Sequence, residues 1–256
     1  MAVELFNDGT HIVHAFYDLV DEGASTAIQC NQFLVVDHEH GALIDPGGNT
    51  TYNGLLMDMQ KHFSSKNLDY IFASHADPDI IASVNKWFVA SPCKVMISQL
   101  WARFVPHFTT GKDLSARIIG IPDAGMKIPL GQCKMLAIPA HFMHAEGNFQ
   151  FYDPISKILF SGDLGTSLVG IDKASTPVTD FGAHIQYMDG FHRRYIVSGK
   201  ICRFWAKMIR ELDIEMIVPQ HGCRFEGKAM VNRFIDWIEQ LECGVDVMTQ
   251  DAYQLP

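Results

Sequence analysis

The chain has 256 residues, of which 48% are hydrophobic and 19% charged, which is enough for one large core and too apolar for a disordered protein. Its 29 acidic and 20 basic residues give a net charge of −9 without a long basic run, which argues against nucleic acid as a partner. The N-terminus lacks the apolar stretch of a signal peptide and no segment approaches a membrane span, so we expect a soluble, cytoplasmic protein.

The first half of the chain predicts an alternation of strands and helices. Its apolar, β-rich runs have the length of buried strands, and the segments between them repeat apolar residues at helical spacing. One run ends abruptly in Ser74-His75, as expected of a strand that feeds polar residues into a loop. We expect strands at 32–36, 42–45, 68–73 and 94–98, the first two forming a hairpin, and helices at 51–63, 80–88 and 100–108.

The second half begins with short β-like runs and ends in helices. A hairpin is expected around Asp153-Pro154. Two β-rich beginnings and two helical ends fit the α+β class, as a four-layer αββα sandwich. Because no linker rich in Pro, Gly or Ser interrupts the chain, we expect a single domain over residues 1–256. The strands are expected at 117–121, 126–128, 134–138, 148–152, 157–161 and 216–218, and the helices at 200–212 and 228–241.

Four of the predicted strands are followed by residues of the kind that bind metals. Residues that leave the ends of neighbouring strands converge on one rim of a scaffold, which is where binding sites are commonly built. Pro78 makes a continuous helix through the first of these loops improbable, so its polar side chains are free to point in different directions. The candidate metal ligands are His75, Asp77, Asp79, His144, Asp163 and His221.

The remaining cysteines and histidines predict no further metal site. Six cysteines are scattered without a Cys-x-x-Cys pair, so buried reduced thiols are a better interpretation than a disulfide framework or a zinc ribbon. A lone loop histidine is more often a surface or hydrogen-bonded residue than a ligand. We accept that interpretation for His11, His14, His38, His40, His62 and His107.

Several motifs, taken in order, resemble those of a known family. The chain resembles the metallo-β-lactamase superfamily and, more narrowly, the diiron half of flavodiiron proteins and their relatives without a flavodoxin domain, the oxygen-binding diiron proteins. The motifs are His75-Ala-Asp-Pro-Asp-Ile80, Pro139-Ala-His-Phe-Met-His144, the segment Tyr152 to Asp163, Gly190-Phe-His-Arg-Arg-Tyr195 and Pro219-Gln-His-Gly222.

The resemblance implies a two-metal site in this sandwich. His75, Asp77 and His144 would hold one metal, Asp79 and His221 the other, and Asp163 would bridge them. Flavodiiron proteins carry Glu where this chain has Asp77, and His where it has Ile80. The second change removes a potential ligand, so we expect the metal at Asp79 and His221 to be the more labile one. Ile80 also fits an ordinary core position.

The donor set indicates iron more than zinc. Three carboxylates nearly offset the charge of two divalent ions, and hard oxygen donors suit iron or manganese better than zinc. The resemblance implies two iron ions joined by an oxo or hydroxo bridge, with zinc or manganese as alternatives. His141 is an alternative ligand to His144 or a residue that orients it. Further candidates for a supporting role beside the ligands are Ile80, His184, Tyr187 and His192.

The resemblance implies a protein that binds dioxygen, as an oxygen or redox sensor in signalling such as chemotaxis, with a cytoplasmic chemoreceptor as a partner. The sequence contains no flavodoxin-like segment and no Cys-x-x-Cys site, so a reductase acting on dioxygen or nitric oxide would need a separate electron-donor protein. A two-metal hydrolase acting on a thioester, lactone or phosphodiester remains an alternative. An oligomer is compatible with the sequence.

Overall fold

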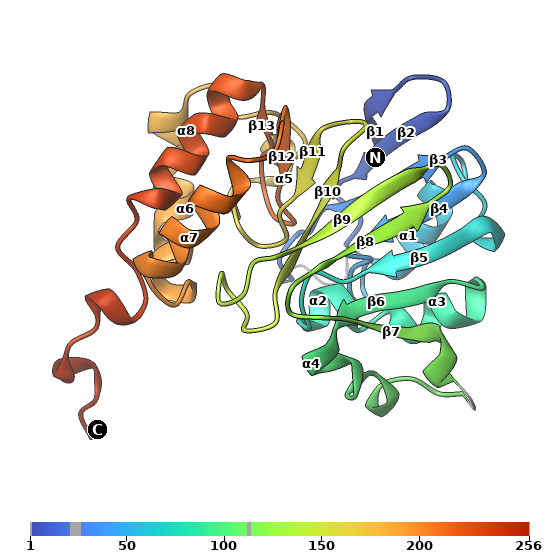
Figure 1. Cartoon of the computed structure of the whole chain (residues 1–256), viewed down its shortest axis with the longest axis horizontal. Coiled ribbons are helices and arrows are strands. Elements are labelled where there is room, and N and C mark those ends of the chain that lie inside the picture. The colour runs from blue at the N-terminus through green and yellow to red at the C-terminus, as the bar shows by residue number, and fades with distance from the viewer. Residues whose placement is uncertain (1, 21–26, 112–113, 256) are drawn as a thin grey trace.

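Two β-sheets pack face to face in the computed structural model, which describes residues 2–20, 27–111 and 114–255 (Figure 1). The first sheet runs in the order β1 (Ala2–Asn7), β2 (His11–Phe16), β3 (Gln32–Asp37), β4 (His40–Ile44), β5 (Leu68–Phe72), β6 (Lys94–Ser98) and β7 (Ile118–Ile121). The second runs in the order β13 (Phe225–Glu226), β12 (Met216–Val218), β11 (Ile158–Phe160), β10 (Phe149–Asp153), β9 (Cys133–Pro139) and β8 (Met126–Leu130).

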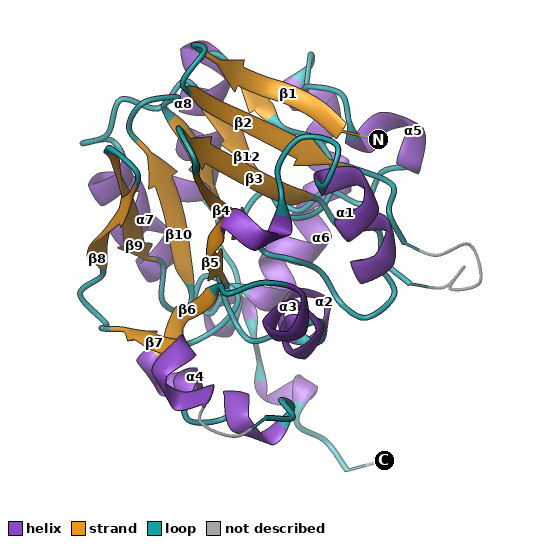
Figure 2. Cartoon of the chain, turned by 90° about the vertical axis from the view of Figure 1, so that its right-hand side faces the viewer, coloured by secondary structure: helices purple, strands orange, loops and turns teal. Residues whose placement is uncertain are grey.

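Helices cover the outer face of each sheet, as Figures 1 and 2 show. The helices of the first half are α1 (Tyr52–Met59), α2 (Pro78–Ile81), α3 (Val84–Ala90) and α4 (Gln99–Ala102). Those of the second half are α5 (Ile171–Ala174), α6 (Phe181–Tyr195), α7 (Gly199–Ile209) and α8 (Lys228–Glu239). Short 3-10 turns lie at Ser65–Asn67, Val105–His107, Leu114–Arg117, Val245–Val247 and Gln250–Ala252. None of the described helices is long and apolar enough to cross a membrane.

Three apolar layers hold this sandwich together. The middle layer lies between the sheets, where Phe72 stacks on Phe151 with ring centroids 4.8 Å apart and Phe33 packs on Phe160 at 5.3 Å. One outer layer joins α1, α2 and α3 to the first sheet, and the other joins α6, α7 and α8 to the second. The predicted four-layer αββα architecture is therefore confirmed.

The strand directions bring several carboxyl ends to one edge. In the first sheet β4, β5, β6 and β7 are parallel to one another. In the second sheet β11 and β12 are parallel, and β9 runs the same way because both β9 and β11 are antiparallel to β10. β3 is antiparallel to β4, so its carboxyl end lies at the opposite edge.

Two predicted helices are wrong in detail. The segment 80–88 forms two helices, because the chain breaks at Ala82 and Ser83, where the buried Ser83 hydroxyl donates to the Gly47 carbonyl oxygen at 2.5 Å. The segment 100–108 forms α4 and a separate 3-10 turn that contains Pro106, which has no N–H to continue a helix. The hairpin of β1 and β2 and the 15-residue helix α6 were not predicted from the sequence.

Candidate metal centre

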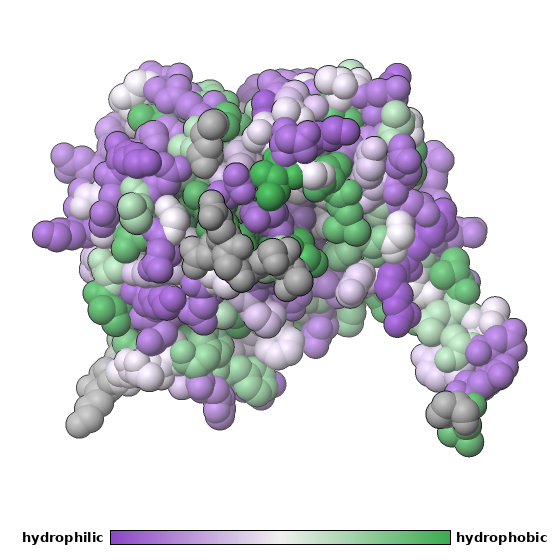
Figure 3. Space-filling view, turned by 180° about the vertical axis from the view of Figure 1, so that it is seen from behind, coloured by the Kyte–Doolittle hydropathy of each residue, from purple (hydrophilic) through white to green (hydrophobic). Residues whose placement is uncertain are grey.

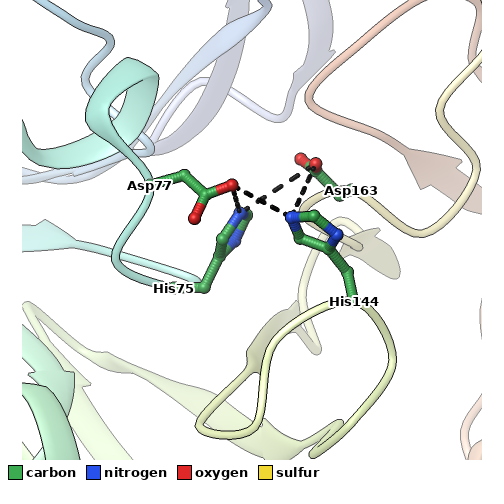
Figure 4. A group of neighbouring side chains, drawn as sticks. All are labelled: His75, Asp77, His144 and Asp163. Atoms are coloured by element: carbon green, nitrogen blue, oxygen red, sulfur yellow. Dashed lines mark hydrogen bonds and ion pairs between the residues drawn. The ribbon is translucent and has the colours of Figure 1, made fainter. Parts of the chain in front are cut away.

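The six candidate ligands gather where the carboxyl ends of the two sheets meet. Three of them, His75, Asp77 and Asp79, lie in the segment that follows β5 in the first sheet. The other three follow strands of the second sheet, since His144 comes after β9, Asp163 after β11 and His221 after β12. Each sheet thus contributes three donors. Figure 4 shows four of them, His75, Asp77, His144 and Asp163, with their side chains pointing toward one another.

Those four side chains form the tighter half of the centre. Asp77 Oδ2 lies 3.0 Å from His144 Nε2 and 3.4 Å from His75 Nε2. Asp163 Oδ2 lies 3.5 Å from His144 Nε2 and 3.9 Å from His75 Nε2. One ligand atom from each residue lies within 4.8 Å of the others, which is the spacing of donors around a single ion.

The other half contains Asp79 and His221. His221 Nε2 lies 3.2 Å from Asp79 Oδ2 and 3.7 Å from Asp163 Oδ1. Asp163 therefore presents Oδ2 to the first pair of histidines and Oδ1 to His221. A carboxylate that divides its two oxygens in this way has the arrangement of a ligand that bridges two ions.

The hydrogen bonds around the cluster fit metal binding. His75 Nε2 and Asp163 Oδ1 are buried and have no hydrogen-bond partner among the described residues, although buried polar atoms are normally paired. Two of the three other ring nitrogens are engaged, because His221 Nδ1 donates to the Gln29 carbonyl oxygen at 2.8 Å and His75 Nδ1 lies 3.0 Å from Ser74 Oγ. The third, His144 Nδ1, has no partner among the residues that the structure describes. The bonds at His75 and His221 fix the ring orientation and direct the Nε2 lone pair toward a metal.

The carboxylates and histidines perturb one another strongly. Burial disfavours a charged imidazole, but the nearby Asp79 and Asp163 carboxylates outweigh it and raise the pKa of His221 to about 9. The pKa of His75 is likewise raised, since Asp77 and Asp163 outweigh its burial. The hydrogen bond from His144, together with the nearby His75 ring, holds the pKa of Asp77 well below its usual range. These shifts reflect three carboxylates gathered around the rings, whose negative charge a metal ion would offset in place of the ring protons.

The loop between β9 and β10 reaches His144 through strained backbone. Phe142 and His144 have φ values of 65° and 105°, in the region that favours glycine, and such strain is commonly found at functional sites. The His144 ring packs against Tyr195, with centroids 5.3 Å apart, and against Phe191 at 5.5 Å. His141 points elsewhere, with Nε2 2.9 Å from the Asp123 carbonyl oxygen, so the geometry favours His144 as the ligand.

Of the residues predicted to support the candidate ligands, His192 contacts the segment beside Asp163, whereas the others lie elsewhere. His192 is fully buried and accepts a hydrogen bond from the backbone N–H of Gly165 at 2.9 Å, two residues beyond Asp163. Burial lowers the pKa of His192 to about 4, so this ring stays neutral. His184 and Tyr187 line a separate cavity of about 440 Å³. Ile80 is fully buried in the apolar layer beneath α2.

Asp45 and Ser74 support the first loop and were not identified from the sequence. Asp45 follows β4 at the same edge, and its Oδ1 accepts a hydrogen bond from the Ser74 backbone N–H at 2.8 Å. Burial raises the pKa of Asp45 to about 6. The sequence signal was available, because Asp45 ends a predicted strand as the ligands do, but its Pro-Gly-Gly continuation favoured a simple turn.

A cavity of about 540 Å³ opens over both halves of the candidate metal centre. Five of the six candidate ligands line its wall: Asp77, Asp79, His144, Asp163 and His221. Apolar, aromatic and small polar side chains form the remainder, among them Ile28, Thr51, Leu168, Phe191 and Tyr195.

A second cluster, made of His11, Asp37, Asp153 and Cys133, lies at the opposite edge. His11 Nδ1 lies 3.0 Å from Asp37 Oδ1, and Nε2 lies 2.7 Å from Asp153 Oδ2. All four residues are buried, and none has an unpaired buried side-chain N or O atom, in contrast to His75 and Asp163. We therefore interpret this cluster as a buried ion pair that joins the sheets. His11 is hydrogen-bonded, as expected.

The comparisons with known proteins agree with this geometry. A family model described as "ODP family beta lactamase" matches residues 28–222. The chain belongs to the ODP family. It is similar to the chemotaxis sensor ODP, described in one structure as a peroxy diiron species, with 37% identity, a TM-score of 0.85, and coverage of 96% of this chain and 97% of that one. The apo state of the T. denticola sensor gives a TM-score of 0.83 at the same identity.

More distant relatives extend the ODP similarity. The chain is 25% identical over 207 residues to the uncharacterized protein MJ0732 of Methanocaldococcus jannaschii, covering 80% of this chain and 51% of that protein. The chain thus spans about half the length of this curated relative. Rubredoxin oxygen:oxidoreductase of Desulfovibrio gigas has the same fold at 16% identity, with a TM-score of 0.78 over 94% of this chain and 61% of that one. The predicted family resemblance is confirmed.

Proposed function

We propose that this ODP-family protein is a non-haem diiron protein that binds dioxygen and acts as an oxygen sensor in the cytoplasm. The observation that carries the proposal is the position of Asp163, whose two carboxylate oxygens face two separate sets of histidine and carboxylate donors. In this proposal His75, Asp77 and His144 hold one iron, Asp79 and His221 hold the other, and residues 1–256 act as one domain. The similarity to a diiron chemotaxis sensor supports it.

The residues have distinct roles in this centre. Two ferrous ions, when bound, would supply open coordination positions and two electrons for dioxygen. Asp77, Asp79 and Asp163 would offset most of the ions' charge. Ser74 and the Gln29 carbonyl oxygen hold two histidine rings in the orientation that such ions would need. Apolar side chains in the cavity wall favour a small neutral ligand over a charged one.

We propose that α6 carries the signal from the centre to a partner. Phe191 and Tyr195, both on α6, pack against the His144 ring, and the two aromatic rings stack with centroids 4.7 Å apart. A shift of His144 therefore acts directly on the carboxyl end of this helix. A cytoplasmic chemoreceptor is the proposed partner. If the protein instead reduced its ligand catalytically, its partner would be an electron-donor protein.

A two-metal hydrolase is the second candidate. The cavity of about 540 Å³ lies within the size range of organic-ligand pockets, so its volume alone would admit a thioester, lactone or phosphodiester. The donor set favours iron and dioxygen, because it has three carboxylates and no fourth histidine.

Protein produced anaerobically with iron available is expected to contain two iron ions per chain, because three carboxylates and three histidines match the preference of iron. Elemental analysis of the purified protein measures this. Uptake of zinc alone under those conditions, together with hydrolysis of esters or phosphodiesters, would favour the hydrolase instead.

Mild chelation is expected to remove the two ions at different rates. The ion at Asp79 and His221 has two terminal protein ligands and should leave first, whereas the ion at His75, Asp77 and His144 has three. Metal content followed over time in a chelator should therefore fall in two phases. The Asp79→Ala variant serves as the control, since it should start with one ion and show the slow phase only. A single phase for both ions in the unmodified protein contradicts this asymmetry.

A further inference from the structure

Gln220 is a fully buried residue whose backbone is fixed next to two ligands of the second half of the centre. It lies between β12 and His221 and has no exposed surface. Its backbone N–H donates to the Gly162 carbonyl oxygen at 2.8 Å, beside Asp163. Its own carbonyl oxygen accepts from the Asn31 N–H at 2.5 Å. The start of the Gln220 side chain is therefore held in a defined position.

The side chain of Gln220 reaches the third ligand, Asp79. Its Nε2 lies 3.3 Å from Asp79 Oδ2 and 3.5 Å from the Asp79 carbonyl oxygen. Asp79 Oδ2 is also the oxygen that faces His221 Nε2, at 3.2 Å. Turning the carboxamide over would place Oε1 against the carboxylate, where two acceptors repel, so the N–H end is the one in use.

The other end of this carboxamide has no such contact. Gln220 Oε1 is buried and meets no hydrogen-bond donor among the described residues. A buried acceptor without a partner is costly, and an apolar side chain of the same size would fill the space without that cost. The hydrogen bond from Gln220 Nε2 to Asp79 explains why an amide side chain, and not an apolar one, occupies this position.

The Asp79 carboxylate has fewer contacts to hold it than the Asp77 carboxylate has. Asp77 Oδ2 lies near two histidines, whereas Asp79 Oδ2 lies near one, His221. The residue next to Asp79, Ile80, faces the core. We propose that Gln220 is a positioning residue that holds the Asp79 carboxylate toward the second ion, an inference that rests on the proposed metal centre. Bonds of this kind to a ligating carboxylate tune metal affinity.

Stepwise ferrous-ion affinities, measured anaerobically by competition with a chelator, test this role. The Gln220→Met variant keeps the length of the side chain and removes its N–H donor. We expect it to bind the second ion about 10–100-fold more weakly while the first ion keeps its affinity. In an Asp79→Ala background, which is expected to hold the first ion only, the same change should leave the affinity for that ion unaltered, because the carboxylate that Gln220 contacts is absent.

Gln150→Met is the matched control. Gln150 is also fully buried, but both ends of its carboxamide are paired, with the Ser161 carbonyl oxygen at 3.2 Å and Trp205 Nε1 at 2.8 Å. The Gln150→Met variant should lower the free energy of unfolding, but it should not weaken the binding of one ion more than that of the other.

The possible results distinguish the two proposals. A wild-type chain that binds fewer than two ions overturns the metal centre and the role of Gln220 together. If the wild type binds two ions, unchanged affinities in Gln220→Met, or an equal loss of both, overturn the role of Gln220 alone.

Discussion

Replacing Asp163 with alanine is expected to reduce the metal content from two ions per chain to none. The side chain is 7% exposed and places Oδ2 near His75 and His144 and Oδ1 near His221, so its removal takes one ligand from each ion. It also leaves a cluster with one fewer negative charge to offset two cations. Elemental analysis after gel filtration, with circular dichroism to check the fold, measures the effect.

The same substitution at two other ligands provides the controls. Asp77→Ala should weaken mainly the first ion, and Asp79→Ala only the second, because each carboxylate contacts one set of histidines. If Asp163→Ala retains one tightly bound ion, Asp163 is a terminal ligand and not the bridge.

The His11→Ala variant is expected to lose about 3–5 kcal/mol of unfolding free energy. The His11 ring is 1% exposed and lies between Asp37 and Asp153, so alanine leaves two buried carboxylates facing each other without the positive charge between them. Urea denaturation of the metal-free protein measures this change. His40→Ala is the control, since the His40 ion pair with Asp69 is largely exposed and should contribute less than about 1 kcal/mol.

The loss of unfolding free energy in His11→Ala should also depend on pH. Burial opposes the charged form of His11, but the two carboxylates outweigh burial and raise the pKa of the ring. The contribution of His11 to stability is therefore complete below pH 6.5 and disappears as the pH rises through the raised pKa. Burial also opposes ionisation of Asp153, but His11 outweighs burial and lowers the pKa of this carboxyl. The contribution of Asp153 to stability is therefore present above pH 3.8 and disappears as the pH falls through the lowered pKa. The difference between the two proteins should be largest from about pH 4 to 6.5. A cost independent of pH over this range and beyond would mean that lost packing, not charge, explains it.

Most of the candidate metal centre could be predicted from the sequence, because the candidate ligands follow strands. Strand ends are marked by a change from apolar to polar residues, and parallel strands bring such ends to one edge. His75, Asp163 and His221 could therefore be placed together from their local sequence alone. His144 lies five residues beyond β9, and its position depends on the loop conformation, so the choice of His144 over His141 needed the family motif.

Other features depend on contacts that no local pattern records. α6 has only four buried residues among 15 and contains Gly182 and Gly190, so its apolar periodicity is weak, and it is fixed by packing on the second sheet. Gln220 and Asp45 act through partners distant in the chain, as does His11, which meets Asp153 across 142 positions. Such pairings follow from the sandwich and cannot be derived from spacing.

The ion pair of His11 and the metal centre join the same two sheets at opposite edges, because Asp37 and Asp153 end strands that run away from the metal. Both edges add to the apolar layer between the sheets, but the His11 edge is held by an ion pair within the protein itself and needs no bound ion. We therefore expect loss of the ions to loosen the ligand edge first, while the apolar layer and the His11 edge keep the sheets together.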